Sequence, residues 1–374
     1  MSIILFILIL LILVVVHELG HFFVARYFGV RVDEFGFGYP PRATKLFNWK
    51  ETVFTLNWLP FGGFVKIFGE NPDDENTNGP DRERSFVHKA KYKQALILVA
   101  GVFMNFLLAW LLIIALFTAG SRSSVDEAMS GARYENIRVT LVDIAKNSPA
   151  AKAGLVAGDE ISSIALDSDP SVSLSGDTAT VKDVQDFINA HSGTPLRFTV
   201  GERLTCCKAP VVVTPVAGIA DGKAGVGVSI DRIGTLHLPL GRAIVEATRK
   251  EWYVSKTIFV FLGKLIHDTV LGHPDISAVT GPVGLVHSVG ITAGFGFSYL
   301  IWFIAFISIN LGIINLLPVP ALDGGRLFFL LIESVKGSRI NPKIANIVNT
   351  VGFGLLILLM LVVTYHDIVH LIKG

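Results

Sequence analysis

Hydrophobic and polar positions divide this chain into long apolar runs separated by polar stretches. Four runs are long enough to cross a membrane as helices, since about 20 apolar residues span a hydrocarbon core of about 30 Å. They cover residues 3–25, 94–119, 297–317 and 344–364. No basic segment precedes the first run and no small-residue cleavage site follows it, so we expect this run to be retained. The pattern predicts a polytopic α-helical membrane protein with four transmembrane helices.

The stretch between the first two runs, residues 26–93, is mixed. Two alternating segments punctuated by glycine, 52–59 and 61–70, predict two strands of a membrane-associated β-hairpin region. This hairpin is either a surface feature or an edge strand that holds an extended peptide by strand addition. In the second apolar run, Gly101 and Asn105 suit tight helix packing and an interhelical hydrogen bond, which is a structural role.

Residues 120–235 are rich in Ser, Asp, Lys and Thr and predict a soluble module. Strands are expected near 139–142, 196–200 and 211–214, and helices at 148–155 and 181–190. This order, together with the run SPAAKAGLVAGDEI, resembles a PDZ domain, so we expect one inserted PDZ-like domain. Residues 236–296 are expected to form a connector, amphipathic over 238–271 and loop-like from 272, which either lies on the membrane or leads back into it.

Composition agrees with a membrane protein. The chain of 374 residues is 51% hydrophobic and 17% charged, whereas soluble domains average about 25% charged residues. The net charge is +1 and no basic-aromatic pattern occurs, so we expect no nucleic-acid partner. The only cysteines, Cys206 and Cys207, are adjacent and are interpreted as free thiols.

Basic residues cluster in the stretches 26–93 and 319–343 but not at the N-terminus. The positive-inside rule therefore predicts that these stretches are cytoplasmic. With four spans, both termini and the PDZ-like domain are then expected outside the cytoplasm.

The sequence HELGH, residues 17–21, completes the first apolar run. His17 and His21 are one helical turn apart, so their imidazoles can bind one metal ion, and Glu18 could act on water at that ion. Ionisable residues within an apolar span are costly and by default mark function.

A catalytic zinc usually takes three protein ligands. Asp323 follows the third span in a segment broken by prolines and glycines, and the opposed directions of spans one and three bring it to the same side of the membrane as His17 and His21. Metal coordination would remove the cost of a buried carboxylate. Alternatively, Asp323 caps a helix that starts at Gly324. The eight other histidines lie in predicted loops, interfaces or the soluble module.

Three motifs together resemble the site-2 protease family of intramembrane zinc metalloproteases, in the branch of the bacterial regulator-of-sigma-E proteases, here with a single PDZ domain. They are HELGH, GGFVKIFGE at 62–70 and NLLPVPALDGG at 315–325. The resemblance implies one Zn²⁺ held by His17, His21 and Asp323, with Glu18 as the base. It also implies that Asn315 and the strand residues bind substrate; these strand residues are Gly62, Gly63, Phe64, Val65 and Lys66.

The resemblance further implies a multi-pass protein of the inner (plasma) membrane that carries out regulated intramembrane proteolysis. Its partners would be membrane lipid and a single-span membrane protein already trimmed by another protease, such as an anti-sigma factor or a remnant signal peptide. Two other classes of function remain to be weighed. A catalytically silent PDZ scaffold would not need Glu18 or Asp323, and a zinc transporter would show internal repeats and more polar spans.

Overall fold

A computed structural model of the chain describes residues 2–70, 78–125, 133–176, 178–201, 210–220, 223–272 and 279–373. Cys206 and Cys207 lie outside the described residues. The chain divides into two compact units, one made of Met1–Ala115 and Ile244–Gly374 and the other of Leu116–Ala243.

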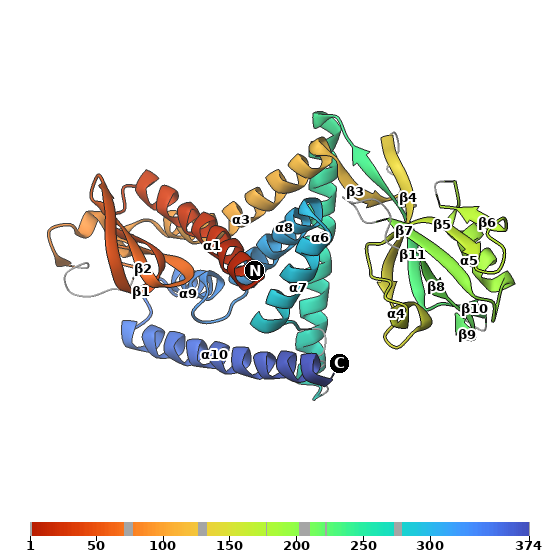
Figure 1. Cartoon of the computed structure of the whole chain (residues 1–374). Coiled ribbons are helices and arrows are strands. Elements are labelled where there is room, and N and C mark those ends of the chain that lie inside the picture. Colours follow the sequence, from red (N-terminus) through yellow and green to blue (C-terminus); the bar gives the residue numbers. More distant parts are fainter. Residues whose placement is uncertain are drawn as a thin grey trace. The chain divides into compact units, whose positions relative to one another are not determined.

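The first unit is mainly helical (Figure 1). Its long helices are α1 (Ser2–Tyr27), α3 (Lys91–Ala119), α6 (Leu240–Val270), α7 (Pro282–Gly294), α8 (Phe297–Leu316), α9 (Asp323–Lys336) and α10 (Pro342–Lys373). Two short 3-10 helices, η1 (Arg82–Arg84) and η2 (Phe86–His88), precede α3. Among the described residues, four helices are long and apolar enough to span a membrane: Ser2–Tyr27, Lys91–Ala119, Phe297–Leu316 and Lys343–Val369. The prediction of four apolar helices is confirmed.

Two segments expected to be irregular contain helices. Within 272–296, α7 covers Pro282–Gly294, and its first turn is bound by Asp367 of α10, whose carboxylate accepts from the Gly281 and Gly284 amides at 3.2 and 2.8 Å. The helix can therefore begin at Gly281 and Pro282, because its N-terminal amides are hydrogen-bonded to an acceptor more than 80 residues away in the sequence. The prediction of a loop at 318–343 is likewise wrong for Asp323–Lys336, which form α9.

The β region also differs from the expected hairpin. Its strands are β1 (Val32–Trp49) and β2 (Thr52–Ile67), so 52–59 and 61–70 belong mostly to one long strand. The register places Glu34–Phe37 of β1 opposite both 53–56 and 63–66 of β2, while 42–49 pairs with 52–57. The segment order is 42–49, 52–57, 33–37, 63–67. Among the described strands none pairs with the outer side of 63–67, which is an open edge.

Two apolar clusters hold this unit together. One joins Phe22 and Ala25 of α1 to the buried faces of β1 and β2, to Ile97 of α3 and to Leu330 of α9. The other packs Ile9 and Leu13 of α1 against α7, α3 and α8. The helix that carries HELGH is therefore fixed at both ends by burial of apolar surface.

The second unit contains a sheet with the order β3-β11-β4-β5-β7-β8, with β6 paired to β5, and a separate pair of strands, β9 and β10. Its strands are β3 (Ser121–Ser124), β4 (Arg133–Ile144), β5 (Glu160–Leu166), β6 (Ser173–Ser175), β7 (Leu196–Gly201), β8 (Val211–Val213), β9 (Val216–Ala220), β10 (Lys223–Gly225) and β11 (Val228–His237). Two helices, α4 (Pro149–Lys152) and α5 (Val181–Ala190), complete the unit. Ser148 caps α4 at 3.1 Å and Thr180 forms a capping box with Asp183 on α5. The expected strands and helices are found, and one apolar core includes Leu141, Val184 and Phe198.

Candidate metal centre

The site begins with one turn of α1. His17 and His21 are both buried, at 6% exposure each, and their Nε2 atoms lie 3.1 Å apart. The rings meet edge to face, with centroids 4.8 Å apart. Four-residue spacing on a helix places both side chains on one face, so the two nitrogens converge on one point.

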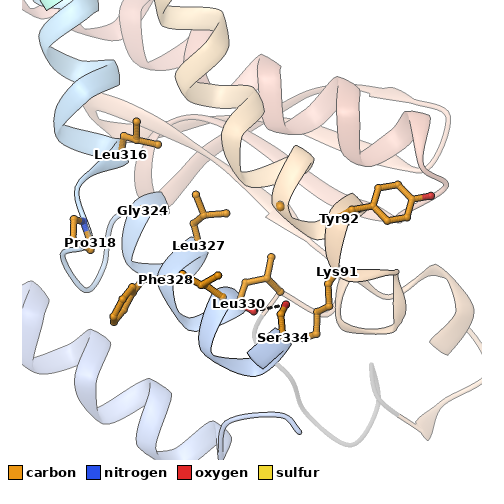
Figure 2. Close-up of a pocket in the computed structure, with 11 residues that line it drawn as sticks. Lys91, Tyr92, Leu316, Pro318, Gly324, Leu327, Phe328, Leu330 and Ser334 are labelled. Atoms are coloured by element: carbon orange, nitrogen blue, oxygen red, sulfur yellow. Dashed lines mark hydrogen bonds between the residues drawn. The ribbon is translucent and has the colours of Figure 1, made fainter. Parts of the chain in front are cut away.

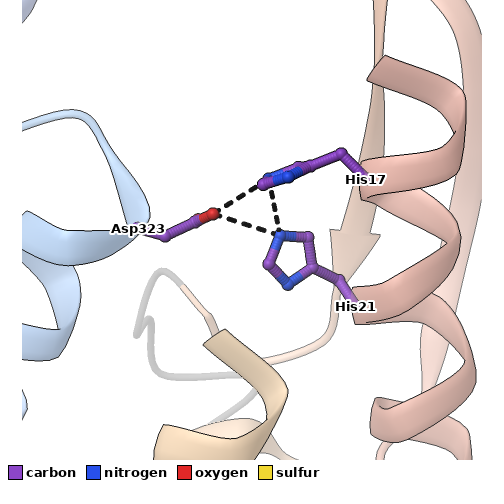
Figure 3. Close-up of side chains that lie close together, drawn as sticks. All are labelled: His17, His21 and Asp323. Atoms are coloured by element: carbon purple, nitrogen blue, oxygen red, sulfur yellow. Dashed lines mark hydrogen bonds and ion pairs between the residues drawn. The ribbon is translucent and has the colours of Figure 1, made fainter. Parts of the chain in front are cut away.

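Asp323 completes the cluster from the start of α9 (Figure 3). Its Oδ2 lies 2.9 Å from His17 Nε2 and 3.3 Å from His21 Nε2. The N-cap of α9 is Leu322, and Asp323 is the first residue of the helix. Its carboxylate contacts both histidines, so Asp323 does more than cap α9.

These three residues fit a zinc ion. One donor atom from each lies within 4.8 Å of the other two, and a set of two histidines and one carboxylate is a usual donor set for catalytic zinc. Both histidines also have a partner on Nδ1. His21 Nδ1 lies 2.8 Å from the Ile97 carbonyl, and His17 Nδ1 lies 3.1 Å from Asn105 Nδ2. Such outer partners orient metal-binding histidines.

Helix α3 can supply those partners because glycines let it approach α1. A Cβ at Gly20 would lie 2.3 Å from the Ala100 carbonyl oxygen. A Cβ at Gly101 would lie 2.3 Å from His21 Nε2 and 2.8 Å from His17 Cε1. Real Cβ atoms essentially never lie this close to other atoms, so a larger residue at Gly20 would force the helices apart and one at Gly101 would displace the histidine rings.

Glu18 lies beside the open edge of β2. The Val65 backbone N–H donates a hydrogen bond to the Glu18 carboxylate. A Cβ at Gly63 would lie 3.9 Å from Glu18 Cγ and 3.9 Å from Val15 Cγ2. The strand residues expected to bind substrate, Gly62, Gly63, Phe64, Val65 and Lys66, therefore run past the expected base. Burial raises the pKa of Tyr39, and a Cβ at Gly62 would lie 3.0 Å from the ring of Tyr39.

Two further links hold the strand and α9 together. Arg326, one turn after Asp323, forms an ion pair with Glu70, which follows β2. Asn315 lies half-buried in the last turn of α8. The structure thus brings His17, His21 and Asp323 into one cluster, with Glu18 on the neighbouring position of α1 and Asn315 before the loop that leads to Asp323.

Sequence reasoning missed what α3 contributes. Ile97, Gly101 and Asn105 are spaced by four residues and lie on one face of α3, which is directed at the two histidine rings. The spacing was visible in the sequence, yet glycine and asparagine within an apolar span are also common in ordinary helix packing. Only the placement of α3 against α1 separates the two interpretations.

Figure 2 shows a separate cavity of about 470 Å³. Its walls come from the start of α3, the end of α8 and α9, and they are almost wholly apolar, with Leu327, Phe328 and Leu331 among them. Gly324 lines the cavity, whereas its neighbour Asp323 and the two histidines do not. The cavity and the metal centre therefore have different lining residues, although α3 and α9 contribute to both.

Comparison with known proteins identifies the family of the chain. The model of the family described as "Peptidase family M50" matches residues 5–370. The zinc metalloprotease RasP of Geobacillus kaustophilus is 30% identical, with 98% of this chain and 97% of the relative covered. The regulator of sigma-E protease RseP of Salmonella typhimurium is 28% identical, with 97% of each chain covered.

These matches extend over nearly the whole chain, and the residues matched by the family model, 5–370, span the positions that build the cluster. Zinc is therefore the cofactor, and the four apolar helices indicate a multi-pass membrane protein. The chain is a zinc metalloprotease and belongs to peptidase family M50, the site-2 proteases.

Proposed function

We propose that this zinc metalloprotease, which carries out regulated intramembrane proteolysis, cuts single-span membrane proteins at a bond within the membrane. One observation carries the proposal: the Asp323 carboxylate lies 2.9 Å from Nε2 of His17, and His17 lies on the apolar helix α1. Because ionisable residues in a membrane-length helix mark a functional site at membrane depth, the substrate bond is expected there too.

The positions of the residues support the following roles. His17, His21 and Asp323 would hold zinc, which would supply the Lewis acidity that makes water nucleophilic at neutral pH. Glu18 takes a proton from the attacking water and delivers it to the leaving amine nitrogen. Glu18 is suited to this task because it lies on the same helical turn as the two histidines. The Val65 N–H orients its carboxylate.

The open edge of β2 presents the substrate. A transmembrane helix hides its amides in i to i−4 hydrogen bonds, so the segment must unwind before hydrolysis. Strand addition to residues 63–67 would satisfy the exposed backbone groups of the unwound segment. Asn315 would bind the same segment from the side of α8. The support is the closeness of this edge to Glu18.

The second unit acts as a PDZ-like filter outside the cytoplasm, where both chain termini also lie. It would admit only substrates that another protease has already trimmed, among them an anti-sigma factor or a remnant signal peptide. The name of the Salmonella typhimurium relative, regulator of sigma-E protease, supports an anti-sigma factor. The protein would lie in the inner (plasma) membrane in contact with lipid.

Glu18→Gln tests the proposal. In purified full-length protein this variant should lose cleavage of a transmembrane reporter and keep zinc at one per chain. Glu246→Gln is a matched control, since Glu246 forms an exposed i,i+3 pair with Arg249 on α6, and such pairs contribute little. Normal cleavage by Glu18→Gln would refute the role of Glu18.

The presentation edge has its own test. A photo-crosslinking amino acid is placed at Phe64, on the open edge, or at Phe47, on the opposite edge of the same sheet, in the Glu18→Gln background. We expect crosslinks to the reporter from position 64 and few from position 47. Equal yields would contradict strand addition at 63–67.

A further inference from the structure

Asn105 lies in the middle of the second apolar span and is fully buried. A buried amide in an apolar helix is costly unless it is hydrogen-bonded. The partner of Asn105 is His17 on another helix, with 3.1 Å between Asn105 Nδ2 and His17 Nδ1. The polar group in this span therefore contacts a metal donor and not only a packing neighbour.

The two nitrogens of His17 face different groups. Nε2 faces Asp323 and His21, while Nδ1 faces Asn105. A neutral histidine that donates its Nε2 lone pair to a metal carries its proton on Nδ1. His21 follows this rule, since its Nδ1 faces the Ile97 carbonyl, which can only accept a hydrogen bond.

His17 needs an acceptor in the same place, and Asn105 can supply one. A half-turn of the side-chain amide exchanges its oxygen and nitrogen at nearly the same positions. The Asn105 Oδ1 is buried and has no hydrogen-bond partner among the described residues. Among the described residues, the half-turn therefore breaks no hydrogen bond of the Asn105 side chain other than the one with His17. In its place, His17 Nδ1–H donates a hydrogen bond to Asn105 Oδ1.

Helix α8 holds Asn105 in place. The Ser308 hydroxyl donates to the Asn105 backbone carbonyl at 2.8 Å, and both residues are fully buried. A Cβ at Gly312 would lie 3.5 Å from Asn105 Cβ, so the helices are close here. The acceptor is thus mounted on two rigid elements, as a partner that orients a metal ligand should be.

We propose that Asn105 is a positioning residue: its side-chain oxygen accepts a hydrogen bond from His17 Nδ1–H and so keeps His17 Nε2 available as a zinc donor. This proposal rests on the proposed zinc-binding role of His17. It concerns affinity for zinc, and Asn105 itself does not touch the substrate.

The test measures the zinc dissociation constant of the full-length protein by competition with a chelator, alongside thermal unfolding. Asn105→Ala should weaken zinc binding by about 10- to 100-fold, the usual effect of losing such a partner. Asn105→Asp, which can only accept, should keep the affinity within about 3-fold of wild type, because a carboxylate also serves as an outer partner. Asn310→Ala is the control, since among the described residues the Asn310 amide donates only to the Phe306 carbonyl of its own helix.

The outcomes separate the alternatives. Wild-type zinc affinity in Asn105→Ala would overturn the proposal, as would equal losses in the Ala and Asp variants, which would indicate a donor at this position. Should Asn105→Ala not fold, Asn105→Leu removes the acceptor at nearly constant volume and is judged by the same criterion. His17→Ala is measured in parallel: zinc retained at wild-type affinity there refutes the proposed function itself, whereas a loss there with no loss in Asn105→Ala refutes only the role of Asn105.

Discussion

Replacing Gly101 by alanine should disable the metal centre while leaving the fold in place. The added Cβ would lie 2.3 Å from His21 Nε2, 2.7 Å from His21 Cε1 and 2.8 Å from His17 Cε1, where ordinary contacts are 3.4–4 Å. Because α3 is held by its own packing, the rings must withdraw by roughly 1 Å, far beyond the ~0.2 Å tolerance of a metal site.

The magnitudes differ for stability and for function. Overpacking lowers the free energy of unfolding by about 1–3 kcal/mol, whereas replacing glycine by alanine in a helix raises it by up to about 1 kcal/mol. The protein should therefore remain folded with a slightly lower Tm. A displacement of about 1 Å at a reacting centre costs on the order of 100-fold in rate. We therefore expect Gly101→Ala to lose zinc affinity and cleavage by at least that factor.

The assay combines chelator competition, reporter cleavage and thermal unfolding of purified full-length protein. Gly354→Ala is the matched control: Gly354 also lies in an apolar span, and a Cβ there would meet nothing within 4 Å. It should bind zinc and cleave normally. If Gly101→Ala also bound zinc and cleaved normally, the close approach of α3 to the histidine rings would be refuted.

Three further predictions concern the cofactor, a buried acid and an ion pair. Stripping zinc with a chelator should abolish cleavage and added zinc should restore it; cleavage that persists in zinc-free protein would contradict the assignment. Burial raises the pKa of Glu251, on α6 outside the four candidate spans, to about 7. Stability should therefore fall as pH rises from about 4.5 through 7, and Glu251→Gln should raise the Tm at pH 8 but not at pH 4.5; an equal effect at both pH values would argue against this ionisation. Arg326→Gln should lower the Tm by leaving Glu70 unpaired. The double variant Arg326→Gln/Glu70→Gln should lose less stability than the sum of the two single variants. Strict additivity in that double-mutant cycle would show that the pair is not coupled.

Local pattern was enough for much of the metal centre. The spacing of His17 and His21 places both rings on one helical face whatever surrounds them. Asp323 is 306 residues from His17, yet it could be predicted, because an acid after an apolar span is costly without a partner. The four spans and the strands and helices of the second unit follow from hydrophobic periodicity and capping residues, which act over a few residues only.

Long-range pairing decided the rest. The strand β1 was not among the predicted strands, because glycines and prolines at 36–41 interrupt the local pattern and the strand depends on pairing with both halves of β2. Helix α7 was missed because its N-terminal amides are bound by Asp367 of α10.

The sequence by itself determined that His17 and His21 share one face of a membrane-length helix and that Asp323 follows another apolar span, since both properties depend on spacing and hydrophobicity along the chain. Tertiary structure alone decided what faces the other side of each histidine: the Ile97 carbonyl for His21 and Asn105 for His17. The physical reason is that a hydrogen-bond partner on a neighbouring helix depends on how closely and at what rotation two helices pack. Here Gly20 and Gly101 permit that approach, and no periodicity within either helix records it.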